Sequence, residues 1–437
     1  MKKNLRRITA VIVVPVILAL LAATAACGAG KKNEEDRVVV HFWGHFNEAW
    51  NISHLEAIER FNASQDKIEV EAVFFPYDEF EEKILHALTL GEAGADVYEI
   101  WGGWMVDFIS SGTLSQVPDH LIADLVNDCY EPVLGALKGG DGKYYGVPLE
   151  FNIEYGGMLV NKPRFEELGI AYPETWNEVA ETARKTTKKS GNLWTMRGLD
   201  FTADDTLTTT FLSMILSMGG EYWVDGKLKL ATPEAENALV TLVDFVKADE
   251  ITNLDSATGA QGDEVEGFDF LGRDEAMMVP RGPWAISELE ENYGKTLGVD
   301  FDYVKFPFYG QIPAFPAETG WSMCVSKNSA AAKAAWEYLE FFLEHDNLMR
   351  HNINCAQVSP RKSVIGTPDY VSRMPYLAPL LDIVEYGRFI GPFNTDVLKS
   401  GLRNTYMSLC SGDGKYASVS EALADLEKNL NEQLGLK

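Results

Sequence analysis

RVVVHFW, at residues 37–43, opens a pattern that decides the fold of this chain. KIEVEAVFF at residues 67–75 and ADVYEIW at residues 95–101 repeat it. All three stretches are rich in β-branched and aromatic residues, as buried strands are. Residues 48–62 and 77–90, which lie between them, carry apolar side chains at helical spacing. Strands that alternate with helices at this pace predict parallel strands in an α/β sheet.

The rest of the chain continues as a mixture of helices and extended segments. Residues 146–160 are expected to be extended, and residues 256–267 to form a polar loop. With 437 residues, the chain exceeds the size of about 150 residues that is usual for one domain. Further helices are predicted at residues 175–187, 207–218, 233–249, 330–343, 376–384 and 419–434.

The first residues have the composition of an export signal. Basic residues at positions 2–7 precede an uncharged apolar run at residues 8–26, which ends in small residues before Cys27. The segment resembles a bacterial lipoprotein signal, in which the cysteine is acylated and becomes the new N-terminus, although Thr24 stands where leucine is commoner. The prediction is a signal peptide at 1–26, lipidation at Cys27 and a solvated tether at 27–36. A plain transmembrane anchor is the alternative, because the run is long enough to span a bilayer.

The charge balance excludes some partners. The chain has 65 acidic and 38 basic residues and a formal net charge of −27, and loss of the signal would remove four more basic residues. Such a surface repels nucleic acid and anionic headgroups and does not attract anionic ligands. A neutral or cationic ligand is therefore favoured.

Signatures of enzymes and metal sites were searched for without success. Tyr293–Thr296 ends like a phosphate-binding loop, but Leu289 stands where its first glycine belongs, and neither H-E-x-x-H nor G-x-S-x-G occurs. Cysteines 129, 324, 355 and 410 lack metal-ligand spacing and are expected to be buried apolar residues, or to include one disulfide. No cofactor and no metal are expected. A carbohydrate-active enzyme stays open, because Glu99, Glu150 and Glu154 could supply the two carboxyl groups of a glycosidase.

The tryptophans are distributed unusually for core residues. Most of them lie in predicted turns beside glycines, at the ends of strands, where α/β sheets bind ligands. Indole stacks on the apolar face of a pyranose ring, and covering ~60–80 Å² of ring contributes about 1.5–2 kcal/mol. This pattern predicts a carbohydrate site. The aromatic residues of this pattern include Trp43, Trp101, Tyr155, Trp223, Trp284 and Trp321.

Over essentially the whole mature chain, the sequence resembles the family 1 extracellular solute-binding proteins of ABC importers, the maltose-binding-protein-like group. Each matching motif is weak alone, but their order and spacing are specific. Gly320-Trp321 departs from the Gly-Gly of many members, so the tryptophan could add a stacking platform or close part of the cleft. The matching motifs are 38–43, 95–101, DGKYYGVP at 141–148, Asn161-Lys162, PETWNE at 173–178, GRDEAM at 272–277, Gly282 with Trp284, Gly320-Trp321, SKNS at 326–329 and AAW at 334–336.

The resemblance implies a two-lobed periplasmic-binding-protein fold, with two α/β domains joined by a hinge and the ligand in the cleft between them. Closure around the ligand would be a hinge motion. By analogy, the N-terminal lobe takes residues 37–149 and 303–352, and the C-terminal lobe takes 150–302 and 353–437. The implied protein is a lipid-anchored monomer on the extracytoplasmic face of the cell membrane, which delivers a mono- or oligosaccharide to the membrane subunits of an ABC importer and is not an enzyme.

Chemistry and resemblance together suggest that these aromatic residues, Trp43, Trp101, Tyr155, Trp223, Trp284 and Trp321, are stacking faces for a sugar. They also suggest polar contacts to sugar hydroxyls. A surface salt bridge is the competing interpretation of Arg361, and Trp176, which precedes a predicted helix, is interpreted as structural. A polyamine, which would bind carboxylates and aromatic rings, is the alternative ligand, and a surface adhesion protein is a third class. The predicted polar contacts are Glu48, Asp78, Glu99, Glu150, Asn152 and Arg361.

Overall fold

Strands and helices alternate along the first described part of the chain, as the sequence predicts. The computed structural model describes residues 37–90, 94–258 and 265–436, so the predicted signal peptide, the tether and the lipidated Cys27 lie outside it. The start of helix α1 illustrates the local reason for an element boundary, because the side chain of Asn47 accepts a hydrogen bond from the amide of Trp50 (3.2 Å). The elements of this part are β1 (Val38–His45), α1 (Glu48–Ser64), β2 (Ile68–Phe75), α2 (Tyr77–Leu90) and β3 (Val97–Trp101).

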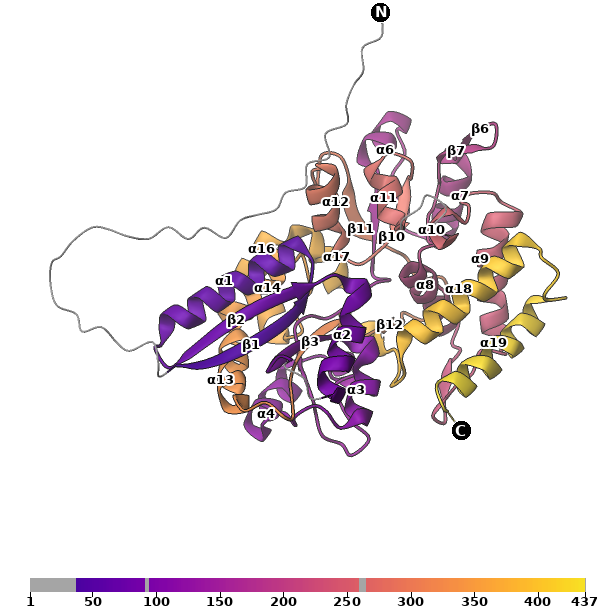
Figure 1. Cartoon of the computed structure of the whole chain (residues 1–437). Coiled ribbons are helices and arrows are strands. Elements are labelled where there is room, and N and C mark those ends of the chain that lie inside the picture. The colour runs from indigo at the N-terminus through magenta and orange to yellow at the C-terminus, as the bar shows by residue number, and fades with distance from the viewer. Residues whose placement is uncertain (1–36, 91–93, 259–264, 437) are drawn as a thin grey trace, which may run out of the picture. The chain divides into compact units, whose positions relative to one another are not determined.

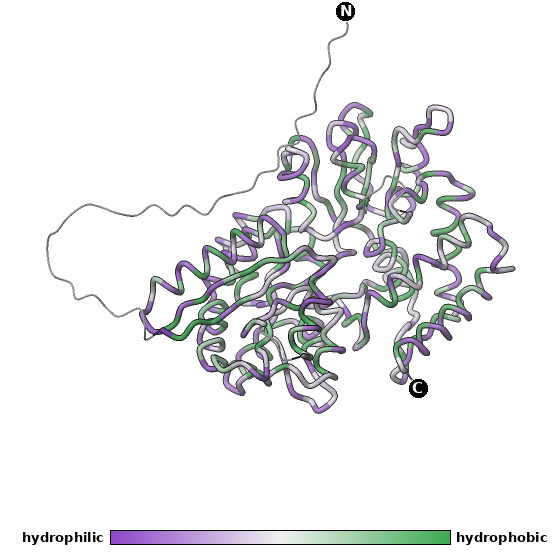
Figure 2. Tube along the Cα trace, in the orientation of Figure 1, coloured by the Kyte–Doolittle hydropathy of each residue, from purple (hydrophilic) through white to green (hydrophobic). Residues whose placement is uncertain are grey.

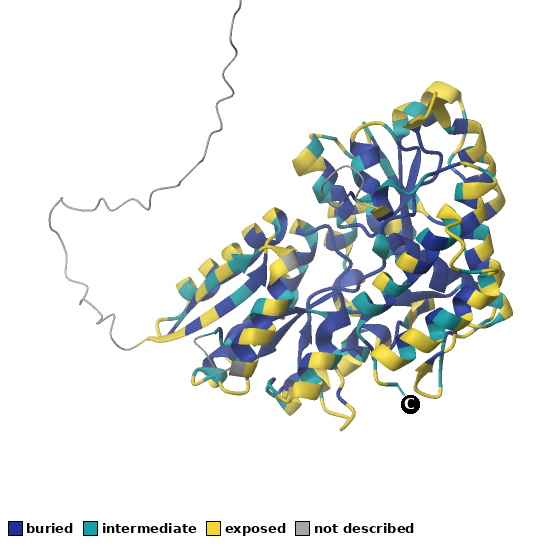
Figure 3. Cartoon of the chain, turned by 45° about the vertical axis from the view of Figure 1, so that its right-hand side comes forward, coloured by how far each residue is buried: buried dark blue, intermediate teal, exposed yellow. Residues whose placement is uncertain are grey.

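The largest sheet in the described part of the chain has five strands, in the order β2-β1-β3-β13-β4. β2, β1 and β3 are parallel. β13 (Trp321–Val325) pairs antiparallel with both β3 and β4 (Val147–Pro148). Hydrophobic residues run along these strands (Figure 2). β3 and β13 are almost fully buried, whereas β1 and β2 also carry exposed residues, and the outer faces of the helices are exposed (Figure 3). A strand from much later in the sequence thus lies between β3 and β4 in this sheet.

Helices pack against this sheet (Figure 1). α1 packs against β2 and α14, and α13 packs against β13 and β1. Apart from α1 and α2, the helices that contribute to this part are α3 (Met105–Ser111), α4 (Asp119–Asp128), α5 (Glu131–Gly135), α13 (Ala332–Phe342) and α14 (His345–Asn354).

The remaining strands form small sheets. β5 (Gly157–Val160) lies between β10 (Met278–Pro280) and β11 (Asp302–Lys305) and is antiparallel to both. The other strand pairs are β12 (Phe315–Ala317) with β14 (Gly387–Phe389), β6 (Lys188–Ser190) with β7 (Leu193–Met196), and β8 (Trp223–Val224) with β9 (Lys227–Leu228).

Helices dominate this second part. α8 (Asp204–Ser217) packs against α9, α18 and β12, and α18 (Thr395–Ser411) also packs against α19 (Figure 1). The other helices are α6 (Lys162–Leu168), α7 (Trp176–Thr186), α9 (Pro233–Lys247), α10 (Asp255–Thr258), α11 (Gly267–Gly272), α12 (Ala285–Tyr293), α15 (Lys362–Ile365), α16 (Pro368–Arg373), α17 (Ala378–Leu381) and α19 (Val419–Gln433).

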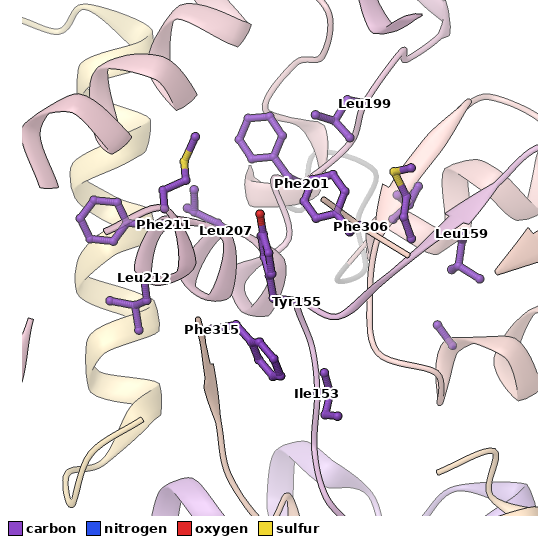
Figure 4. Packing of buried hydrophobic residues seen from close by; sticks show 14 of the residues in the cluster. Ile153, Tyr155, Leu159, Leu199, Phe201, Leu207, Phe211, Leu212, Phe306 and Phe315 are labelled. Atoms are coloured by element: carbon purple, nitrogen blue, oxygen red, sulfur yellow. The ribbon is translucent and has the colours of Figure 1, made fainter. Parts of the chain in front are cut away.

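Two hydrophobic cores lie within residues 38–436. The first core takes its buried side chains mainly from residues 40–149 and 321–355. The second takes them mainly from residues 151–317 and 356–430, and part of it is shown in Figure 4. Tyr303, Phe306 and Phe315 belong to the second core, although the sequence analysis assigned residues from 303 onward to the first lobe.

Most predicted elements are confirmed to within a few residues, with three differences. Residues 146–160 contain only the short strands β4 and β5, and an irregular segment joins them. Residues 376–384 form short turns of helix, including α17, rather than one helix. The predicted loop 256–267 begins within α10 and ends at the start of α11, and residues 259–264 lie outside the described chain.

Candidate ligand-binding site

One edge of the five-stranded sheet collects aromatic and acidic residues. His45 ends β1 and Trp101 ends β3, and both strands point to this edge. β13 runs the opposite way, so its first residue, Trp321, pairs with Trp101. Glu150 follows β4, whose end meets the start of β13. The topology therefore brings together four residues that are up to 276 positions apart in the sequence.

The aromatic rings at this edge pack on one another. The rings of His45 and Trp321 are parallel, with centroids 3.9 Å apart and an interplanar angle of 2°. Trp101 and Tyr77 meet the same indole edge-on, at 5.6 and 6.0 Å. Trp321 is only 7% exposed, whereas Trp101 is half-buried. The rings form a preorganised apolar wall, with Trp101 as its most accessible indole.

Gly320 allows Trp321 to take this place. Its φ of +67° lies in the left-handed region that glycine tolerates. A Cβ there would stand 2.1 Å from Oε1 of Glu150, which accepts a hydrogen bond from the amide of Trp321 (2.9 Å). Any larger residue would displace Glu150.

Glu99 lies beneath the wall. It is fully buried, and its two carboxylate oxygens contact the rings of His45 (2.8 Å) and His54 (3.2 Å). Burial opposes ionisation of Glu99, but these two histidines outweigh it and hold its pKa well below the ordinary value. Glu99 thus orients His45, and His45 in turn supports Trp321.

Helix α18 supplies a polar wall of the same cavity. Asp396, Lys399, Ser400 and Arg403 have the i, i+3, i+4, i+7 spacing of one helix face, and all four line the same cavity. Lys399 also lies over the ring of Trp101, with its Nζ 5.2 Å from the centroid.

Ion pairs engage the cationic side chains of this polar wall. Lys399 Nζ contacts Asp205 (2.6 Å) and Asp396 (3.1 Å), and Arg403 contacts Asp204 (2.9 Å). Burial opposes ionisation of Asp205, but Lys399 and Arg281 hold its pKa below the ordinary value. These pairs connect α18 to the start of α8.

Arg281 and Trp284 complete this side. Arg281 pairs with Glu266, and its guanidinium lies 4.7 Å from the centroid of Trp284. The indole Nε1 of Trp284 donates to Glu154 (2.8 Å), which also accepts from the amide of Gly282 (3.0 Å).

These groups enclose a cavity of about 500 Å³. This volume lies within the ~300–1,000 Å³ that is usual for small-molecule sites. Its lining combines residues of the five-stranded sheet with residues of α8 and α18 and with Trp284, which precedes α12, and it also includes Asn152 and Gln357. An apolar aromatic wall facing convergent polar groups is suited to binding a polyhydroxylated ring.

The sequence matches a known protein family. The family described as "Bacterial extracellular solute-binding protein" matches residues 54–349, which is more than half of the chain. The chain belongs to this solute-binding protein family.

Two curated relatives of this solute-binding protein have sugar names. An arabinooligosaccharide-binding protein of Halalkalibacterium halodurans is 25% identical over 235 residues, which are 52% of this chain and 49% of that protein. A multiple sugar-binding protein of Streptococcus mutans is 24% identical over 309 residues, which are 66% of each chain. The chain thus matches about half of the first relative and just under two thirds of the second.

Solved structures establish the fold. An ABC substrate-binding protein of Listeria monocytogenes in complex with cycloalternan is similar to this chain with a TM-score of 0.75 and 17% identity, covering 92% of this chain and 100% of that one. The solute-binding protein therefore has the two-lobed α/β fold of periplasmic binding proteins, as the sequence predicts.

The structure brings five of the predicted contact residues into the cavity: Trp101, Glu150, Asn152, Trp284 and Trp321. Asp78 lies in α2, but its side chain is outside the described part of the chain. The contacts of these five residues and of Asp78 with a ligand stay predictions.

Tyr155 lies inside the second core rather than in the cavity. It is 1% exposed, its hydroxyl donates to the carbonyl of Pro307 (3.0 Å), and its ring packs among core side chains such as Phe306 (Figure 4). Glu99 is also unavailable to a ligand, because both its carboxylate oxygens already contact histidines. Neither side chain is now expected to touch a ligand.

Four further predicted contacts lie away from the cavity lining. Trp43 packs edge-on against Phe75, and Trp223 packs against Phe393. Glu48 is exposed in the first turn of α1. Arg361 forms ion pairs with Asp124 and Asp128, which is the salt bridge that was its competing interpretation.

The sequence analysis missed much of the polar wall. α18 was not predicted as a helix, so the common face of its four residues went unnoticed. Its repeat of polar residues at helical spacing between Asn394 and Gly412 was the available signal. His45 was not among the predicted contacts, although its position just after the predicted strand 37–43 could have placed it in the site.

Within the described residues, the side chains of His, Cys, Asp and Glu form no group of three or more arranged to hold a metal ion. The four described cysteines are free, and three of them are buried. The helices of the described chain are all too short or too polar to span a bilayer.

Proposed function

We propose that this protein captures a carbohydrate, most simply an oligosaccharide, in the cavity and delivers it to the membrane subunits of an ABC importer. The single observation that carries the proposal is the pairing of exposed indole surface with unsatisfied polar atoms in one cavity. Membership of the extracellular solute-binding family and the sugar-named relatives support it.

The unsatisfied atoms favour hydroxyl groups as partners. Trp101 Nε1 and Arg281 Nε are buried donors without an acceptor, and Glu150 Oε2 is a buried acceptor without a donor. A buried polar atom without a partner costs about 1–3 kcal/mol. Sugar hydroxyls both donate and accept, so a sugar suits a cavity whose lining residues carry unpaired atoms of both kinds. A polyamine only donates and leaves the two protein donors unpaired.

We assign the lobes from the two cores: residues 38–149 with 321–355, and residues 150–320 with 356–437. Binding without chemical conversion, attachment to the membrane through acylated Cys27, a location on the extracytoplasmic face and a monomeric state belong to the same proposal. They follow the family's role and the lipoprotein-like N-terminal sequence.

A thermal-shift screen against mono- and oligosaccharides tests the function. We expect a neutral or cationic sugar to raise the melting temperature, and calorimetry to give a micromolar Kd, which corresponds to about −8 kcal/mol. An assay for new reducing ends on the same sugars should show no turnover. Turnover would support the carbohydrate-active enzyme instead, and the absence of any stabilising sugar would contradict both.

A further inference from the structure

Glu150 has an unused hydrogen-bonding position inside the cavity. The residue is 2% exposed, and Oε1 accepts the amide of Trp321, while Oε2 has no partner within the described structure. Oε1 occupies the space beside Gly320 that a Cβ would fill, and its hydrogen bond to the amide of Trp321 holds it there. The described part of the protein therefore gives Oε2 no hydrogen-bond donor, and a ligand could supply one.

The charges that act most strongly on Glu150 are negative. They come from Glu154, Glu99 and Glu318, and burial together with these charges raises its pKa well above the ordinary value. Glu318 is 5% exposed and also has an unpartnered oxygen, Oε2.

The cations of the cavity do not compensate this charge. Lys399, Arg281 and Arg403 pair with Asp205, Asp396, Glu266 and Asp204 instead. A buried carboxylate needs a paired cation to be stable in its ionised form. The protein supplies none to Glu150, which leaves this role to the ligand.

We propose that the solute is an amino sugar, or an oligosaccharide that contains one, whose ammonium group pairs with Glu150. This rests on the proposed function and specifies its ligand. The ammonium would also lie in the cavity that Trp101 and Trp321 line, and indole faces attract cations. A charge-assisted hydrogen bond is roughly twice as strong as a neutral one, so an amine gains more at Glu150 than a hydroxyl does.

Three matched trisaccharides test the proposal: chitosan trisaccharide, cellotriose and triacetylchitotriose. They share a β-1,4-linked backbone and differ at C2, which carries an ammonium, a hydroxyl or an acetamide. Glucosamine with glucose and galactosamine with galactose extend the test to monosaccharides. We expect that, in at least one of these matched sets, the sugar with the amino group binds at least tenfold more tightly than the sugar with a hydroxyl group at C2. Calorimetry at neutral pH measures both affinities. Binding of the amino sugar should also release up to one proton, measured in buffers of different ionisation enthalpy, because Glu150 ionises when the cation binds.

Glu150→Gln keeps the size of the side chain and an oxygen for the amide of Trp321, but removes the charge. We expect it to reduce the preference for the amine to about twofold or less. Glu59→Gln makes the same chemical substitution at an exposed position of α1, away from the cavity lining, and should keep the full preference. Because the comparison of ligands uses the unaltered protein, the test does not depend on the variants folding.

The outcomes separate the two proposals. Binding of the hydroxyl or acetamide sugars as tightly as the amines overturns the amino-sugar inference and leaves the sugar receptor standing. An undiminished preference in Glu150→Gln also overturns it. Binding of spermidine as tight as that of the amino sugars overturns the sugar scaffold, and failure of every sugar to bind overturns the proposed function together with this inference.

Discussion

Trp101 is the indole that we expect to contribute most to affinity. It is half-buried, lines the cavity, and has an unpartnered Nε1. Trp101→Ala removes a stacking face worth about 1.5–2 kcal/mol and one donor. We therefore expect sugar affinity to fall at least tenfold in calorimetry. Trp194→Ala is the matched control, because Trp194 stacks under Lys189 in the β6–β7 hairpin, outside the cavity lining. Equal losses in both variants would contradict a stacking role for Trp101.

Glu99→Gln tests the support beneath the aromatic wall. Because the pKa of Glu99 is lower in the folded than in the unfolded protein, its ionisation stabilises the fold fully above about pH 4.5 and loses this effect as the pH falls through the folded-state value. Removing one partner of a buried charge network should cost about 3 kcal/mol at neutral pH. Urea unfolding should show this deficit near neutrality and a smaller one in acid.

Glu71→Gln is the control for this pH dependence. Glu71 lies 3.7 Å from His41 on the same sheet, but both side chains are more than half exposed. Exposed pairs contribute little, so this variant should unfold almost like the unaltered protein at every pH. A deficit of Glu99→Gln that grows in acid would contradict the assigned ionisation.

At the level of single residues, the sequence could identify candidate site residues, but not whether each side chain points into the cavity or into a core. Trp101, Trp284 and Trp321 were predicted by the same signal as Tyr155 and Trp43, an aromatic side chain beside a turn or strand end. Whether such a ring faces a cavity or a core depends on the strand partner and the pleat. Those are set by β13 and by the irregular segment after β4, and neither was visible in the periodicity.

At the scale of elements, helix α7 explains the motif PETWNE. Thr175 accepts a hydrogen bond from the amide of Glu178 (3.3 Å), and the carboxylate of Glu178 accepts from the amide of Thr175 (3.0 Å). Trp176 packs edge-on against Phe306, so its structural interpretation agrees with its position. The motif therefore starts a helix and anchors it to the second core.

Thr175→Ala should lower the free energy of unfolding by about 1 kcal/mol, because it removes one half of this capping box. Thr175→Ser, which keeps the hydroxyl, should lose much less. Chemical denaturation measures both, and sugar affinity should stay within twofold in each variant because α7 does not line the cavity. A clear loss of affinity would show that the motif acts on the site.

Elements with a strong period were predictable, and those set by distant partners were not. β1, α1, β2 and α2 follow β-branched or helical patterns in the sequence, and α1 also has a local cap at Asn47, so these elements could be predicted from neighbouring residues. β13 is a short apolar segment that becomes a strand only because β3 and β4 lie on either side of it. α18 carries polar side chains on its cavity face, which weakened its helical signal.

At the scale of the whole molecule, the sequence could indicate two lobes but not every crossing point. Residues 303–317 have the composition of any buried segment, and periodicity does not state which core receives them. The structure places Tyr303 and Phe315 in the second core. A boundary between lobes is a property of long-range contacts, so only the resemblance to a family offered an estimate of it.

Hydrogen bonds join residues of the two proposed lobes, and they predict the energetics of the expected hinge closure. Asn47 donates to Glu288 (2.6 Å), Trp104 to Asp396 (2.7 Å) and Asn394 to Asp107 (2.7 Å). An open form must break these bonds, so the solute has to favour the closed form by its differential affinity. In small-angle scattering, we expect a saturating sugar to decrease the radius of gyration.

The double variant Asp107→Ala/Glu288→Ala tests this balance, because it removes an acceptor from two of the three bonds. The closed form then loses about 1–2 kcal/mol, and the apparent sugar affinity should fall about fivefold to thirtyfold, since the ligand must supply that energy. The fully bound radius of gyration should equal that of the unaltered protein, because the contacts with the ligand remain. Glu59→Ala/Glu82→Ala makes the same change of charge on exposed positions of α1 and α2 and should bind normally. A radius of gyration that does not respond to saturating sugar would rule out closure as the source of affinity.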